Sequence, residues 1–109
     1  MKIAIVGSRN VSVSDIGRYI SNAEEIVSVG AVGVDCCAAE YAKENGIRLT
    51  EFLPRYDIYG RAAPIVRNKQ IVDYSDKIIA FWNGSSRGTL SVIKYAQKTG
   101  KPCEIIICK

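Results

Sequence analysis

The stretch that decides the fold is Lys77–Lys94, KIIAFWNGSSRGTLSVIK. Its first part, residues 78–82, is an apolar run of the length and β-branched or aromatic character typical of a buried strand. A polar turn with two glycines follows, and apolar residues then recur at helical spacing until Gly100, a typical residue to end a helix. This order of elements points backbone amides and a helix N-terminus toward an anion. A plain connection capped by Ser or Thr would share the pattern, so this stretch alone leaves phosphate binding and simple connection open.

Strand and helix patterns alternate along the whole chain. We expect strands at 2–6, 26–29, 47–53, 78–82 and 103–108, of which the first and the last two have buried character. Helices are expected after a capping box at 12–15, after the turn at 30–33, from about Ala63 to Tyr74, and after the turn at 83–89. The segment Pro54–Gly60 is rich in turn formers and is expected to be a loop.

This alternation predicts an α/β fold: a Rossmann-like, three-layer α/β/α sandwich around a five-stranded parallel sheet with right-handed crossovers. The expected strand order is 3-2-1-4-5, which makes the first and fourth strands neighbours. Ligands of such sheets bind in the crevice at the point where the strand order reverses. Three glycine-marked turns, after the first, second and fourth strands, should therefore meet at one edge of the sheet. Their convergence favours phosphate binding over plain connection.

The amino-acid composition limits the classes of function that this chain can have. The 109 residues form one domain, 1–109, and the net charge of +4 is spread over scattered residues, which suits a small anionic ligand without requiring nucleic acid. No stretch is long and apolar enough to span a bilayer and no charged-then-apolar leader precedes the first strand, so we expect a cytoplasmic protein. The four cysteines lack zinc-site spacing and are expected to be buried free thiols. Histidine is absent, which excludes histidine-based nucleophilic and acid–base mechanisms.

The turns resemble those of a known family. Gly7-Ser8-Arg9 resembles the GSR that follows the first strand in the Smf/DprA–LOG (SLOG) superfamily, and residues 28–35, SVGAVGVD, are similar to its SGxAxGxD signature. Arg67-Asn68, followed by Ile71, resembles its RNxxI segment, and residues 84–89, GSSRGT, resemble its second glycine turn. The likeness runs over nearly the full length in the same order, and is nearest to small, mostly uncharacterised bacterial members. It implies a pocket for a nucleotide or nucleotide-derived ligand, such as AMP or ADP-ribose, and a homodimer.

The residues assigned to this pocket are Gly7, Ser8, Arg9, Gly30, Ala31, Gly33, Asp35, Arg67, Asn68, Asn83, Gly84, Ser85, Ser86, Arg87, Gly88 and Thr89. Several also have a structural interpretation. Arg9 could pair with a phosphate or be a solvated loop residue, and Asp35 could bind ribose hydroxyls or favour a helix N-terminus. Thr89 could bind phosphate, cap a helix or do both.

Two departures from the family bear on the type of function. The LOG phosphoribohydrolases carry a catalytic glutamate in PGGxGTxxE, and the matching position is Val92, which cannot polarise water or stabilise a developing charge. The DNA-processing branch binds single-stranded DNA with a larger chain and a wider basic surface than this sequence offers. We therefore expect a non-catalytic nucleotide-binding or sensing domain with no metal site. A nucleoside monophosphate N-glycosidase and a single-stranded DNA binder are the alternatives.

Overall fold

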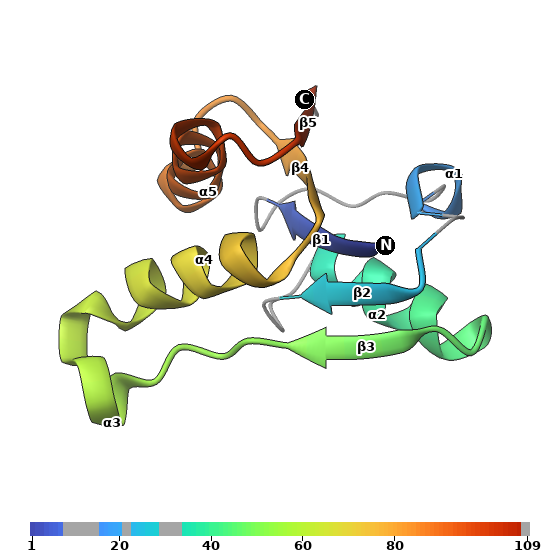
Figure 1. The fold of residues 1–109 in the computed structure, drawn as a ribbon, viewed down its shortest axis with the longest axis horizontal. Helices are drawn as coiled ribbons and strands as arrows, with labels where there is room; N and C mark the ends of the chain where they lie inside the picture. Colours follow the sequence, from blue (N-terminus) through green and yellow to red (C-terminus); the bar gives the residue numbers. More distant parts are fainter. Residues whose placement is uncertain (8–15, 21–22, 29–33, 108–109) are drawn as a thin grey trace.

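A computed structural model of the chain describes residues 1–7, 16–20, 23–28 and 34–107. In this part of the chain five parallel strands form one sheet in the order β3-β2-β1-β4-β5 (Figure 1), as the sequence predicts. The strands are β1 (Lys2–Gly7), β2 (Glu25–Ser28), β3 (Arg48–Glu51), β4 (Lys77–Trp82) and β5 (Cys103–Ile107). The pairing of β1 with β4 places Ile5 opposite Ile79 and Gly7 opposite Phe81.

Helices cover both faces of the sheet (Figure 1). They are α1 (Gly17–Ile20), α2 (Val34–Glu44), α3 (Tyr56–Tyr59), α4 (Ala63–Tyr74) and α5 (Arg87–Thr99), with a short 3-10 helix, η1 (Gly60–Ala62), between α3 and α4. The bounds of α4 agree with the prediction, and Pro64 lies in its first turn. Gly100 follows α5 with a φ of 75°, in the left-handed region that favours glycine, so it ends the helix as expected.

The alternating side chains of the central strands build two apolar clusters, one on each face. Ile3, Ile5 and Phe81 pack with α1 and α2, whereas Ala4, Val6 and Ala80 pack with α4 and α5. Burial of each Ile, Val or Phe side chain stabilises the fold by roughly 1.5–3 kcal/mol. Because β1 and β4 are covered on both sides, their apolar runs are continuous, which is the pattern that made them recognisable in the sequence.

Four elements differ from the sequence-based expectations. The strand expected at 47–53 is shorter, and the segment expected to be a loop, Pro54–Gly60, contains α3. β2 begins at Glu25, one residue before the strand expected at 26–29. β5 is an edge strand, and three of its five residues, Glu104, Ile105 and Ile107, are exposed, so its predicted burial is wrong. An apolar run cannot distinguish a central strand from an edge strand.

The capping box at 12–15 and Cys108 lie outside the described residues, as do the side chains of Cys36 and Cys37. Cys103 is a free thiol and is half-buried, and this burial raises its pKa. In the described ranges no helix is long and apolar enough to cross a membrane.

Candidate functional site

The order of the strands defines the position at the edge of the sheet where a ligand can bind. β1 and β4 are neighbours, yet the chain leaves β1 toward α1 on one face and leaves β4 toward α5 on the other. The helices that follow these two strands therefore lie on opposite faces of the sheet, while the carboxyl ends of the strands, at Gly7 and Phe81, are paired in register. This is the switch point at which open parallel sheets bind ligands.

The sequence analysis assigned the turns that follow β1, β2 and β4 to this site. Ser8, Arg9, Gly30, Ala31 and Gly33 lie outside the described residues. Asp35 is in the first turn of α2, and its side chain is likewise outside them. The described part of the site is therefore Gly7, the turn 83–89 and the second turn of α4.

The turn 83–89 is shaped by its own side chains. The Oδ1 atom of Asn83 accepts hydrogen bonds from the backbone amides of Ser85 and Ser86, both at 2.9 Å, and from the Ser85 hydroxyl at 3.2 Å. From the other side, the indole Nε1 of Trp82 donates to the carbonyl oxygen of Ser86 at 3.0 Å. Gly84 has a φ of 90°, which a residue with a side chain adopts only with strain. Two amides of the turn are thus already bonded within the turn.

The start of α5 is capped by Ser86. Its Oγ accepts a hydrogen bond from the amide of Thr89 at 3.5 Å and lies 3.4 Å from the Thr89 hydroxyl. Thr89 is buried and lies inside the helix, so the interpretation of Thr89 as the cap is wrong. A capped helix still has amides without intrahelical acceptors in its first turn. Here these are the amides of Arg87 and Gly88, for which the described part of the chain provides no acceptor.

The surface at these two amides is open. Gly88 is exposed, and a Cβ added there would meet no atom of the described chain within 4 Å. The first turn of α5 contains no acidic residue. Free amides, a helix N-terminus and the side chain of Arg87 together favour an anion at this point.

Arg67 and Asn68 lie on the neighbouring helix, α4. Both lie on the second turn of α4, which packs beside α5 on the same face of the sheet. Asn68 is buried, and its Oδ1 accepts from the Nε and a terminal nitrogen of Arg67 at 3.4 and 3.3 Å. The amide of Asn68 therefore orients the guanidinium of Arg67. Because helices that follow parallel strands run back along them, the first turns of α4 and α5 both start at the carboxyl edge of the sheet.

Two features of this region could be read only in part from the sequence. Asn83 was predicted as a ligand residue, and in the structure its described bonds hold the turn. Trp82 was not assigned to the turn, yet its indole nitrogen donates a hydrogen bond to the carbonyl oxygen of Ser86. An Asn at the start of a glycine turn is the signal for the first role, since Asn side chains commonly bond amides two residues on.

The position that aligns with the catalytic glutamate of the LOG phosphoribohydrolases lies in the core. Val92 is 2% exposed and packs in the apolar cluster of α4, α5 and the sheet. It contributes no polar group to the carboxyl edge. Within the described residues no group of three or more Cys, Asp or Glu side chains is placed to hold a metal ion.

Comparison with models of known protein families gives no match, and a search of curated proteins finds no relative of this chain.

Proposed function

We propose that this chain is a small SLOG-like domain that binds a nucleotide or nucleotide derivative through its phosphate at the carboxyl edge between β1 and β4. The proposal rests on the backbone amides of Arg87 and Gly88, for which the described part of the chain provides no acceptor. Both amides lie at the N-terminus of α5, beside the switch point between β1 and β4. A phosphate oxygen bound there would accept from both amides. The proposed protein is a cytoplasmic sensor rather than a hydrolase.

The guanidinium groups near this edge fit the same ligand. Arg87 follows the turn directly, and Arg67 is oriented by Asn68 on the adjacent helix. The motif that contains Arg9 follows β1 and supplies a third candidate. Arginine suits this purpose because its planar guanidinium can donate two parallel hydrogen bonds to a phosphate.

Calorimetry with AMP, ADP, ADP-ribose and NAD tests the proposal. We expect the wild-type chain to bind at least one of these ligands, and Arg9→Ala to weaken binding by about 1.5–3 kcal/mol, the range for hydrogen bonds to charged groups. Gly88→Val should abolish binding, since its side chain would occupy the space that the phosphate needs. Added Cβ atoms have room in the free protein at this position, so this loss should not come from unfolding.

Two results would refute the phosphate site: no ligand of the panel binds, or Arg9→Ala binds as well as the wild type. A single-stranded oligonucleotide belongs in the same panel. Tighter binding of the oligonucleotide than of any mononucleotide would favour the DNA-binding alternative instead.

A further inference from the structure

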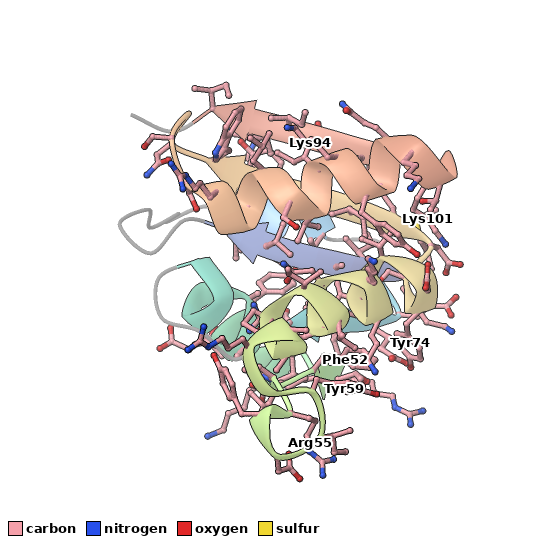
Figure 2. All side chains as sticks on the ribbon, turned by 90° about the vertical axis from the view of Figure 1, so that its left-hand side faces the viewer. Phe52, Arg55, Tyr59, Tyr74, Lys94 and Lys101 are labelled. Atoms are coloured by element: carbon pink, nitrogen blue, oxygen red, sulfur yellow. The ribbon has the colours of Figure 1, made fainter. Side chains whose placement is uncertain are left out.

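The strand at one rim of the sheet, β5, is open on its outer side. In the described part of the chain it pairs only with β4, in a continuous register from Cys103 opposite Ile78 to Ile107 opposite Trp82. Figure 2 shows β5 at the border of the sheet, above α5. Ile105 and Ile107 are 38% and 56% exposed. A strand in this position presents backbone amides and carbonyls with which another chain can pair.

The hydrogen bonds to β4 define which backbone groups of β5 face outward. The amide of Ile78 donates to the carbonyl oxygen of Pro102 at 2.9 Å, so the backbone groups of residues 102, 104 and 106 point toward β4. Because the direction alternates along a strand, the amides and carbonyls of Cys103, Ile105 and Ile107 point away from the sheet. The described residues offer them no partner. An extended peptide supplies the matching row of acceptors and donors.

The exposed isoleucines of β5 lie on one face of the sheet. Cys103 packs against the apolar cluster of α4 and α5, and the alternation along the strand places Ile105 and Ile107 on that face as well. Glu104 lies on the other face, where its carboxylate pairs with Lys77 at 3.5 Å. A strand added beside β5 would cover both isoleucines with its own alternate side chains.

The opposite rim of the sheet, β3, is not open in the same way. This strand has four residues, and its exposed ones are the charged Arg48 and Glu51. Charged side chains on a short edge strand discourage pairing with other chains. β5 instead exposes two isoleucines, contains no proline or basic residue, and keeps an unbroken register with β4. The sheet is therefore protected at β3 and accessible at β5.

We propose that β5 is a docking site for an extended, acidic segment of another protein, which pairs with its outer edge as an additional strand. The charge next to β5 selects the acidic partner. Residues 87–101, which include the neighbouring helix α5, contain four basic side chains and no acidic one. Lys101 is held by the carbonyl oxygen of Ser75 at 2.6 Å, whereas Lys94 and Lys98 are exposed. Figure 2 shows Lys94 on the part of α5 beside β5.

A second copy of the chain and a nucleic acid fit this edge less well. Two β5 edges that paired with each other would bring two sets of these lysines together, and like charges repel. A nucleic acid would use the lysines but would leave the outward backbone groups and the two exposed isoleucines without partners. An acidic strand satisfies the charges, the backbone groups and the apolar side chains together.

A synthetic peptide of alternating valine and threonine, with two aspartates at each end, is the probe for this edge. Its control carries lysines in place of the aspartates. Fluorescence anisotropy of the labelled peptides should show that the wild type binds the aspartate peptide at least about tenfold more tightly than the lysine peptide. Methylation of alternate backbone nitrogens in the aspartate peptide should abolish binding, because it removes the donors that pair with β5.

Ile107→Glu and Ile58→Glu form a matched pair of variants. Ile107 on β5 and Ile58 on α3 are 56% and 59% exposed, and α3 lies away from β5 (Figure 1). Ile107→Glu should weaken binding of the aspartate peptide at least about tenfold, since it removes apolar contact and adds a repelling charge. Ile58→Glu should bind as the wild type does. Circular dichroism checks that both stay folded. Lys94→Glu, on the surface of α5, is a second variant and should reduce the preference for aspartate over lysine.

NMR of the wild type with the aspartate peptide should move the amide signals of Cys103, Ile105 and Ile107 more than those of residues 104 and 106. Binding of neither peptide, equal binding of both, or unchanged binding after backbone methylation would overturn the proposal. So would binding that survives both Ile107→Glu and Lys94→Glu. Self-association that Ile107→Glu abolishes would mean that a second copy occupies the edge. Displacement of the peptide by a single-stranded oligonucleotide would assign the lysines to nucleic acid instead.

Discussion

At the scale of single residues, a buried carboxylate lies at the amino edge of the sheet, opposite the candidate site. Glu25 begins β2 and is buried, with its carboxylate accepting hydrogen bonds from the hydroxyls of Tyr74 and of Thr50, the latter at 2.8 Å. The Nε atom of Arg48 lies 3.7 Å from the Oε1 atom of Glu25. The Tyr74 hydrogen bond is the main reason that the pKa of Glu25 is lowered, with Thr50, Arg48 and Lys2 adding to it and burial opposing it. This cluster joins β2, β3 and the end of α4.

Glu25 should make the protein less stable in acid. A pKa that is lower in the folded than in the unfolded state contributes stability that is complete above the ordinary value of 4.5 and is lost as the pH falls through the lowered native value. Tyr74→Phe should cost about 1–3 kcal/mol near neutral pH, because it removes a donor from a buried carboxylate. It should also reduce the loss of stability in acid. Urea denaturation at neutral and acidic pH measures both effects.

Tyr95→Phe is the matched control for Tyr74→Phe. The Tyr95 hydroxyl also donates to a carboxylate, that of Asp73 at 3.0 Å, but this pair is exposed and should contribute little. If the two variants lose the same stability at neutral pH, burial of the Glu25 carboxylate is not what makes its hydrogen bond valuable.

Val92 leads to a prediction about chemistry. Because this side chain is in the core, the catalytic carboxylate of the LOG phosphoribohydrolases, which this sequence resembles, has no counterpart at this position. Incubation with AMP or other nucleoside monophosphates should therefore release no free base above background, as chromatography of the reaction would show. Base release that disappears on substitution of Asp35, Glu40 or Glu51 would mean that another carboxylate has taken over, and the hydrolase alternative would be correct.

At the scale of elements, the turn 83–89 and the start of α5 have to cap a helix and also leave room for a ligand. Ser86 caps the helix, and Gly88 leaves the second helical position open. Ser86→Ala should destabilise the ligand-free protein by about 0.5–2 kcal/mol, the usual cost of losing an N-cap. Gly88→Ala should stabilise it by about 0.4–1 kcal/mol, since alanine fits a helix better than glycine does.

Urea denaturation of the two variants beside the wild type measures these changes. If Ser86→Ala lowers the free energy of unfolding and Gly88→Ala raises it, then glycine at position 88 reduces stability, as expected of a residue that makes room for a ligand. A destabilised Gly88→Ala would contradict the open space found around Gly88 and would make this glycine a structural requirement.

The elements also show what the sequence could and could not predict. α4 was predicted from about Ala63 to Tyr74 because Pro64 suits the first turn of a helix, and the observed bounds agree. α3 was missed because its residues, Tyr56–Tyr59, bury nothing, so no periodic pattern marks them. The burial of β5 was predicted wrongly because the apolar run alone indicated a buried strand, although the predicted strand order already placed this strand at the edge of the sheet.

At the scale of the whole molecule, the strand order follows from the alternation of strands and helices and from the few topologies that such an alternation allows. This order could be predicted, and with it the edge of the sheet at which β1 and β4 end side by side. The internal bonds of the turn could not be predicted, because the sequence does not reveal which amides Asn83 occupies and which remain open. The Glu25 cluster was missed for a similar reason, since its partners Thr50 and Tyr74 are distant in the sequence.

The central claim is that a nucleotide phosphate binds at the N-terminus of α5, beside the switch point between β1 and β4. An NMR titration that follows each backbone amide tests it most directly, using whichever of AMP, ADP, ADP-ribose and NAD binds best. We predict that the amide signals of Arg87 and Gly88 move in a saturable manner with those of residues 7–9, while the amide of Glu25 at the opposite edge stays in place. Saturable shifts confined to other parts of the chain, or no shift with any of the four ligands, would contradict the claim.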